Sequence, residues 1–267
     1  MPTIKDFMDL RGRRAMITGA TGGVGKVISD TLAELGADLI LVDRQGTDFD
    51  ILSETLQNRW GIKTQSRYCD LEQQEQRAEL IKWIHDSGEC LNILINNAAF
   101  VGTSDLRGWA VPFEEQTIDT WRRAMEVNLT AVFDLCKGLM PLLKTSEGAS
   151  IINIASIYGE YGPDWGLYEG TKMSNPAAYG ASKAGLIQFT RWLATTAAPH
   201  VRVNAISPGG IFRNQPSQFV ERYEARTPLG RMATEDDFKG VMSFLASDLS
   251  LYMTGQNLFV DGGWGIW

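Results

Sequence analysis

The chain has 267 residues, of which 44% are hydrophobic and 21% charged, and this composition excludes a disordered or fibrous protein. Its 25 Lys and Arg residues against 32 Asp and Glu residues give a net charge of −7, so no positive excess is available for nucleic acid or an anionic membrane surface. Cys69, Cys90 and Cys136 form no C-x-x-C pair, and the N-terminal segment has no apolar signal core. We therefore expect a cytoplasmic protein with no metal site, no disulfide framework and no nucleic-acid or membrane partner.

Short apolar runs alternate along the chain with longer stretches of helical periodicity, which is typical of βα units around a parallel sheet. The periodicity predicts strands at 13–18, 37–43, 63–69, 91–99, 149–156, 201–207 and 257–263. It predicts helices at 24–36, 49–60, 71–87, 117–143, 178–197 and 235–248. No repeat or Pro/Ser-rich linker interrupts the series, so we expect one domain over 1–267: a Rossmann-like, doubly wound α/β fold with a seven-stranded parallel sheet and helices on both faces.

Two segments break the regular spacing of these elements. Residues 157–177 and 208–233 are rich in glycine, proline and aromatic residues without a period. Long loops in a compact α/β domain are usually functional, and ligands bind outside the carboxyl ends of the strands. Because both segments begin where a predicted strand ends, they are predicted to be substrate loops, with ordinary surface loops as the plain alternative.

A glycine-rich turn lies between the first predicted strand and the first predicted helix. Gly19, Gly23 and Gly25 stand there in a T-G-x-x-x-G-x-G pattern, which differs from G-x-G-x-x-G. Glycines allow a tight turn and leave backbone N–H groups free at a helix N-terminus, where an anion is favoured. Their position favours a dinucleotide-binding turn over a simple connection.

The second predicted strand ends in Asp43, about twenty residues beyond the glycines, where a carboxylate binds ribose hydroxyls and repels a 2′-phosphate. This position favours NAD(H) over NADP(H) as the cofactor. Arg44 follows directly and would suit a 2′-phosphate, so it argues in the other direction. If Asp43 is only a solvated strand end, the choice of cofactor stays open.

Tyr179 and Lys183 are four positions apart in the predicted helix 178–197, so their side chains share one face. A phenol with an ordinary pKa near ~10 is a poor base at neutral pH. A neighbouring ammonium favours the phenolate, and we expect Lys183 to lower the pKa of Tyr179. A solvated Tyr/Lys pair is the alternative interpretation.

Taken together, these motifs resemble the short-chain dehydrogenase/reductase family over essentially the whole chain. The resemblance rests on the order and spacing of ITGATGGVG at 17–25, Asp43, Cys69-Asp70-Leu71, Asn96-Asn97-Ala98-Ala99, Asn128, Ser156, Tyr179 with Lys183, and Pro208-Gly209. It implies a single-domain NAD(P)-dependent oxidoreductase that interconverts a secondary alcohol and a ketone.

The resemblance also implies roles for particular residues. Tyr179 would be the general acid/base, Ser156 would orient the substrate oxygen, and Lys183 would hold the nicotinamide ribose. Asn128 would complete a proton path to Lys183 through its backbone and a water, so that the catalytic set is Asn128, Ser156, Tyr179 and Lys183. The expected cofactor-binding residues are Gly19, Thr21, Gly23, Val24, Gly25, Asp43, Asp70, Leu71, Asn97, Lys183, Pro208, Gly209 and Ile211.

Two departures from the family pattern concern the ligands. Arg213 stands where the family usually has a threonine, and three alternatives are open: a contact with the cofactor pyrophosphate, a contact with a charged group of the substrate, or a solvated loop arginine. The segment between Ser156 and Tyr179 is longer than is common. That segment and the PGGIFRNQP stretch are similar to the flagellin-modification oxidoreductases, which implies a polar, sugar-like or phosphorylated substrate of surface-glycan biosynthesis.

Two other functions remain open at this stage. A dehydratase or epimerase would use bound NAD without net redox change, and a non-catalytic protein would only sense the dinucleotide. The family resemblance further implies a homo-oligomer, a tetramer or a dimer, in which the helices near 117–143 and 178–197 pair between subunits. The C-terminal DGGWGIW segment is expected to pack on a neighbour or over the site.

Overall fold

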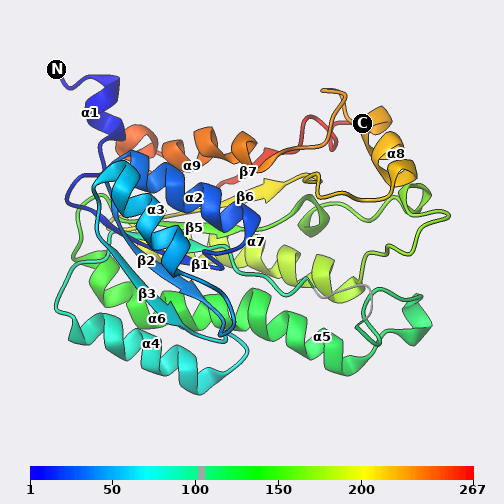
Figure 1. Ribbon diagram of the computed structural model, residues 1–267, viewed down its shortest axis with the longest axis horizontal. Coiled ribbons are helices and arrows are strands. Elements are labelled where there is room, and N and C mark those ends of the chain that lie inside the picture. Colours follow the sequence, from blue (N-terminus) through cyan, green and yellow to red (C-terminus); the bar gives the residue numbers. More distant parts are fainter. Residues whose placement is uncertain (102–105) are drawn as a thin grey trace.

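The computed structural model describes residues 1–101 and 106–267, and seven strands in these ranges form one parallel sheet (Figure 1). Residues 102–105, in the loop expected at 100–116 between the strand predicted at 91–99 and the helix predicted at 117–143, lie outside the described residues. The strand order is β3-β2-β1-β4-β5-β6-β7, which confirms the predicted doubly wound fold. The strands are β1 (Arg14–Thr18), β2 (Asp38–Asp43), β3 (Thr64–Tyr68), β4 (Ile93–Asn96), β5 (Ser150–Ile154), β6 (Arg202–Pro208) and β7 (Asn257–Val260).

Nine α-helices occur in the described residues, and none of them is long and apolar enough to cross a membrane. They are α1 (Ile4–Met8), α2 (Gly23–Glu34), α3 (Asp50–Trp60), α4 (Gln74–Asp86), α5 (Ile118–Met125), α6 (Ala131–Lys144), α7 (Ala177–Ala197), α8 (Ser217–Arg226) and α9 (Lys239–Ala246). Short 3₁₀ turns lie at η1 (Phe113–Glu115), η3 (Ile157–Gly159), η4 (Trp165–Leu167), η5 (Glu235–Phe238) and η6 (Asp248–Ser250), and η2 (Glu126–Thr130) is a π-helical turn.

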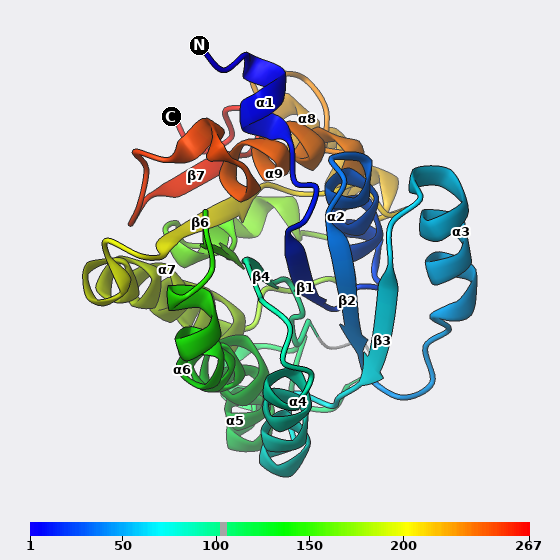
Figure 2. The same ribbon diagram turned by 90° about the vertical axis from the view of Figure 1, so that its left-hand side faces the viewer.

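Both faces of the sheet are covered by helices, as Figure 2 shows. Alternate residues of β1 divide between two hydrophobic clusters, because successive side chains of a strand point to opposite faces. Met16 packs into a cluster with α4, α6 and α7, whereas Ile17 packs into another with α2, α3 and α9. The central residues of β1 and β2 are apolar and buried, as expected for strands that helices cover on both faces. The polar end residues of β1, Arg14 and Thr18, are buried as well.

The segment 208–233 is more regular than its sequence suggests, because it contains the ten-residue helix α8. Phe219 and Tyr223 lie four positions apart on this helix, and both are buried against Met232 and Trp264. The i, i+4 spacing of these two aromatic residues is the helix signal that this part of the sequence offers. The polar residues around them obscure the helical periodicity of hydrophobic residues. Trp264 comes from the C-terminal segment, which therefore packs on the chain itself, while Ile266 and Trp267 stay exposed.

The segment 157–177 and α8 are joined to each other by arginines from α8. Arg226 forms an ion pair with Asp164, and its guanidinium lies 4.5 Å from the ring centre of Trp264. Arg222 donates hydrogen bonds to the carbonyl oxygens of Gly166 (3.2 Å) and Glu169 (2.5 Å). The two irregular segments therefore form one layer beyond the carboxyl ends of β5 and β6.

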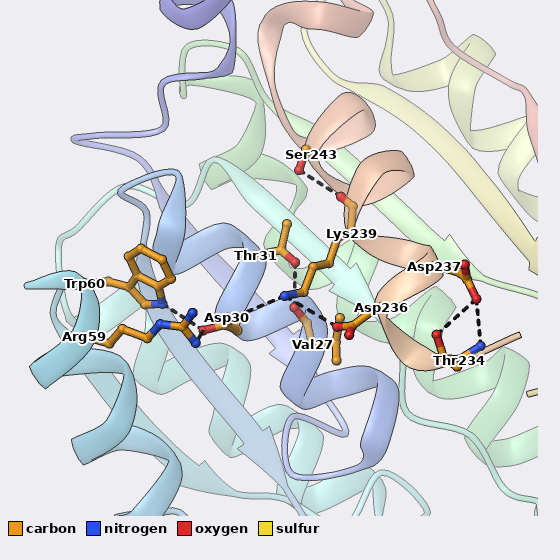
Figure 3. Close-up of polar contacts among 10 residues, drawn as sticks. All are labelled: Val27, Asp30, Thr31, Arg59, Trp60, Thr234, Asp236, Asp237, Lys239 and Ser243. Carbon is orange, nitrogen blue, oxygen red and sulfur yellow. Dashed lines mark hydrogen bonds and ion pairs between the residues drawn. The ribbon is translucent and has the colours of Figure 1, made fainter. Parts of the chain in front are cut away.

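Asp30 on α2 is the common acceptor that holds α3 and α9 against α2 (Figure 3). Its carboxylate accepts hydrogen bonds from Trp60 Nε1 at 2.8 Å and Arg59 Nη1 at 3.3 Å, and lies 3.6 Å from Lys239 Nζ. The Asp30 side chain is only 19% exposed, so these partners replace much of its hydration. This carboxylate therefore adds a polar connection to the hydrophobic packing of α2 against α3 and α9.

We expect Asp30→Ala to lower the free energy of unfolding by about 1–2 kcal/mol, because it removes charge-assisted hydrogen bonds that are largely shielded from water. Asp236→Ala is the matched control, since Asp236 also pairs with Lys239 but is 76% exposed. That change should cost less than about 0.5 kcal/mol. Urea denaturation of both variants measures the difference, and equal losses would contradict the role given to Asp30.

Candidate active site

A cleft of about 820 Å³ lies at the carboxyl ends of the strands, where the order reverses between β1 and β4. Every residue that the sequence predicts to bind the cofactor lines it: Gly19, Thr21, Gly23, Val24, Gly25, Asp43, Asp70, Leu71, Asn97, Lys183, Pro208, Gly209 and Ile211. Ser156 and Tyr179 also line this cleft. The fold thus brings together nearly the whole predicted site, and only Asn128 lies behind the cleft wall.

The glycine turn has the shape and polarity of an anion-binding loop. A Cβ atom on Gly25 would lie 2.0 Å from the carbonyl oxygen of Gly19, so the turn closes only without a side chain there. Gly19 itself has a φ of +65°. No side chain caps α2 at Gly22, and its first turn has no acidic residue, so backbone N–H groups and the positive end of the helix dipole face the cleft. The turn therefore fits the diphosphate of a dinucleotide.

Asp43, the last residue of β2, is held at its side of the cleft by the same turn. Its Oδ2 accepts hydrogen bonds from the backbone N of Thr21 at 3.0 Å and from Thr21 Oγ1 at 2.6 Å. Its Oδ1 accepts from the backbone N of Arg44 at 2.9 Å, whereas the Arg44 side chain is exposed. The carboxylate is therefore oriented and fixed, which suits a group that receives ribose hydroxyls.

Asn97 braces the glycine turn against β4. Its Nδ2 donates to the carbonyl oxygens of Thr18 at 2.9 Å and Gly19 at 3.0 Å. In return, Thr18 Oγ1 accepts from the backbone N of Asn97 at 3.0 Å and of Ala98 at 3.1 Å. These bonds join the ends of β1 and β4, the two strands that border the cleft.

The helix α7, which carries Tyr179 and Lys183, is held on the sheet by a buried chain of polar side chains. Asn96 Nδ2 donates to Asn153 Oδ1 at 2.8 Å, and Asn153 Nδ2 donates to Thr190 Oγ1 at 2.8 Å. Lys183 is itself buried, and its Nζ donates to the carbonyl oxygen of Ile154, the last residue of β5, at 2.6 Å. The lysine is therefore anchored to the strand end next to Ser156.

Burial sets the pKa values of the central pair. It lowers the pKa of Lys183 from 10.5 to about 8. It also raises the pKa of Tyr179, against the smaller lowering effects of the Ser156 side chain and the Arg213 charge. This direction is opposite to the one expected from the Tyr179–Lys183 spacing, because loss of hydration dominates and Lys183 Nζ lies 5.8 Å from the tyrosine ring centre.

Asn128 lies in the π-helical turn between α5 and α6, which breaks the helix expected at 117–143. Such turns often occur at functional sites. Asn128 Oδ1 accepts from the backbone N of Phe100 at 2.6 Å, and Nδ2 donates to Ser182 Oγ at 3.0 Å. The Asn128 side chain thus connects the loop after β4 to α7 beside Lys183. Its hydrogen-bond partners are Phe100 and Ser182, so the side chain has a structural role here.

A second pocket, of about 380 Å³, opens from the cleft at Ser156 and Tyr179, which line both cavities. Tyr158 and Tyr168 face it with hydroxyl groups 2.7 Å apart, and Asn175 Nδ2 donates to the Tyr168 hydroxyl at 3.4 Å. The remaining walls include Met173, Phe219, Tyr223 and Met232 from the two irregular segments, and Trp109 from the stretch between β4 and α5.

The sequence predicted the walls of this pocket only as the two irregular segments 157–177 and 208–233. The aromatic content of 157–177 could have pointed to Tyr158 and Tyr168 as pocket residues. The i, i+4 spacing of Phe219 and Tyr223 could have indicated the helix α8. No local pattern marked Trp109 or Asn175, because their place in the wall depends on loop packing.

The family described as "Enoyl-(Acyl carrier protein) reductase" matches residues 19–265. The 3-oxoacyl-(acyl-carrier-protein) reductase of Thermotoga maritima is 31% identical over 263 residues, covering 96% of this chain and 99% of that protein.

Two solved structures share the fold over nearly their full length. A short-chain dehydrogenase of Leptospira borgpetersenii with bound NAD+ has a TM-score of 0.83 at 33% identity, with 99% of this chain and 96% of that chain covered. A gluconate 5-dehydrogenase of Burkholderia cenocepacia in complex with NADP and tartrate has a TM-score of 0.86 at 27% identity, with 99% and 100% covered. The chain therefore belongs to the short-chain dehydrogenase/reductase family, and it is an NAD(P)-dependent oxidoreductase.

The buried Lys183 makes the stability depend on pH. Between about pH 8 and pH 10.5 the unfolded chain holds a proton that folded Lys183 has lost, so stability rises with pH in this window. We expect the free energy of unfolding of the wild type, relative to Lys183→Met, to rise by up to about 3 kcal/mol across it. Urea denaturation of both proteins at pH 7 and pH 10.5 measures the change, and a constant or falling difference would contradict it.

Proposed function

We propose that the protein is an NAD(H)-dependent oxidoreductase that interconverts a secondary hydroxyl and a ketone on a polar, sugar-like substrate. The observation that carries this proposal is the position of Ser156 and Tyr179 at the junction of two cavities. One cavity has the features of a dinucleotide site, and the other is a smaller pocket with aromatic walls. A substrate carbon atom at this junction would place its reacting hydroxyl group next to the side chains of Tyr179 and Ser156.

Tyr179 and Ser156 are the groups that would handle the substrate oxygen. Ser156 Oγ accepts a hydrogen bond from the backbone N of Tyr158 at 3.2 Å, which holds the hydroxyl group at the junction, where it would donate its proton to that oxygen. The raised pKa keeps Tyr179 protonated at neutral pH, which suits a proton donor for ketone reduction. A bound nicotinamide dinucleotide would supply the hydride chemistry.

Lys183 would assist the tyrosine electrostatically. One of its three ammonium protons is engaged by Ile154, which leaves the others for ribose hydroxyls in the cleft. The positive charge favours a developing phenolate when Tyr179 gives up its proton. Asn128 is proposed to support this arrangement by fixing the turn beside α7, and to lead a proton path through its backbone and a water.

The cofactor is proposed to be NAD(H) because Asp43 is fixed by Thr21 at the adenosine end of the cleft. A carboxylate there accepts the ribose hydroxyls and repels a 2′-phosphate. Asp70 and Leu71 line the cleft and are proposed to flank the adenine, whereas Pro208, Gly209 and Ile211, which line it too, are proposed to border the nicotinamide.

The substrate is proposed to be a polyhydroxyl compound. The Tyr158, Tyr168 and Asn175 side chains offer neutral hydrogen-bonding groups, and aromatic walls suit the apolar face of a sugar ring. Among the described lining residues of this pocket there is no Lys, Arg, Asp or Glu, which favours a neutral sugar over a phosphorylated one. The segments 157–177 and 208–233 are proposed to be the substrate loops, and the similarity to flagellin-modification oxidoreductases favours a role in surface-glycan biosynthesis.

The chain is also proposed to form a homodimer or homotetramer. Phe133 on α6 and Trp192 on α7 are 47% and 57% exposed, and Phe189 lies between them with ring centres 5.9 and 6.4 Å away. An exposed aromatic cluster on neighbouring helices is typical of an interface. The same helices pair between subunits in the family that the chain resembles.

We expect Tyr179→Phe to retain NADH binding and to lower kcat by about 10²–10⁴-fold, because only the proton-transfer group is removed. NADH fluorescence titration and steady-state turnover measure the two effects. Unchanged turnover would refute the proton donor. Tyr168→Phe is the matched control, since it removes a hydroxyl from the pocket wall rather than from the junction.

The substrate and cofactor are tested together by measuring turnover with NAD+ and NADP+ on neutral sugars and polyols, sugar phosphates and simple secondary alcohols. We expect NAD+ and a neutral sugar-like compound to give the highest kcat/KM, with one NADH formed per substrate. Activity on the simple alcohols alone would refute the sugar-like substrate, and preference for NADP+ would refute the role of Asp43. Product without NADH would indicate a dehydratase or epimerase.

A further inference from the structure

Arg213 lies over the glycine turn, although it comes from the segment after β6. Its backbone N donates to Gln215 Oε1 at 2.6 Å, which fixes the local turn. Its side chain lines the cofactor cleft, and Nε lies 3.2 Å from Glu235 Oε1. The arginine therefore reaches the cofactor cleft rather than the walls of the substrate pocket.

The Arg213–Glu235 pair lies directly against Gly23, the first residue of α2. A Cβ atom on Gly23 would be 2.7 Å from Glu235 Oε1 and 3.2 Å from Arg213 Nη2. Both charged groups thus lie on the first helical turn, beside the N–H groups that suit an anion. Gly23 leaves room for this contact because it has no side chain.

Glu235 differs from the two acidic residues that follow it in η5. Asp236 lies 3.5 Å from Lys239 Nζ, and Asp237 accepts from the backbone N of Thr234 at 2.8 Å and pairs with Arg231 at 2.6 Å. Figure 3 shows Asp236 and Asp237 with Lys239 and Thr234. Glu235 is the one of the three whose carboxylate meets the glycine turn and the arginine there.

We propose that Arg213 binds the diphosphate of the cofactor, and that it exchanges its ion pair with Glu235 for that diphosphate when the cofactor enters. The Arg213 and Glu235 side chains are 54% and 28% exposed, so their ion pair is weak and easily replaced. A diphosphate offers a guanidinium two charge-assisted hydrogen bonds in a fixed geometry. The carboxylate of Glu235 would repel the incoming anion and swing away. This inference rests on the proposed dinucleotide-dependent function.

The test uses three ligands that differ in the diphosphate. NADH and ADP-ribose carry it, and adenosine does not. We expect Arg213→Thr to raise the Kd of NADH and ADP-ribose by about ten- to a hundredfold and to leave that of adenosine unchanged, as measured by calorimetric titration. Unchanged binding of all three ligands would overturn the proposal, and so would weaker binding of NADH alone, because Arg213 would then meet the nicotinamide.

Glu235→Gln tests the exchange. Removal of the competing carboxylate should lower the Kd of ADP-ribose several-fold. Asp236→Asn is the matched control, because it removes one negative charge from the same turn but its side chain pairs with Lys239. Weaker or unchanged binding by Glu235→Gln, or the same gain in both variants, would overturn the exchange.

The outcome is separable from that of the proposed function. If the wild type binds no NADH, the proposed function itself fails. If the wild type binds NADH and Arg213→Thr binds it equally well, only the role of Arg213 fails. Thermal unfolding of each variant verifies that these exposed substitutions leave the fold intact.

Discussion

The site depends on the pairing of β1 with β2 on one side and with β4 on the other. The chain returns to the sheet on opposite sides of β1, so the connections after β1 and β4 diverge and a crevice opens between them. The close contact of Gly25 with Gly19 lets α2 begin at this crevice. On the β4 side of the crevice, Asn97 donates a hydrogen bond to the end of β1. The remaining site residues lie at the carboxyl ends of strands or on helices that follow them.

Burial of polar groups is the second constraint. Lys183, Asn96, Asn153 and Asn128 are buried beneath the site, where hydrogen bonds to protein groups replace most of their hydration. The same burial keeps a proton on Tyr179 and makes Lys183 a weaker base, so the reactive pair is set by its surroundings as much as by its spacing. The resulting network holds α7 in one position relative to β5.

The irregular segments turn a general dinucleotide fold into a particular binding site. Arg222 and Arg226 attach α8 to residues 157–177, and Trp264 fills the space between them. The pocket wall is built from two distant segments, and Trp264 of the C-terminal segment packs against its residues Phe219 and Tyr223, so changes in any of the three segments affect the wall. Differences in substrate choice among proteins of this fold can therefore arise without change at Ser156 or Tyr179.

The sequence by itself determined the fold class and the seven strands, because hydrophobic periodicity is a local signal. The glycine turn and the family motifs predicted residues that do line the cleft, whereas other lining residues such as Phe100 and Arg123 were not predicted. It did not reveal α8 or the π-helical turn at Asn128, since both are stabilised by packing against distant residues. Only the tertiary structure decided the direction of the Tyr179 pKa and the contact of Arg213 and Glu235 with Gly23. The loss of hydration around a side chain and the pairing of charges depend on which distant segments come into contact. A local sequence pattern contains no information about those contacts.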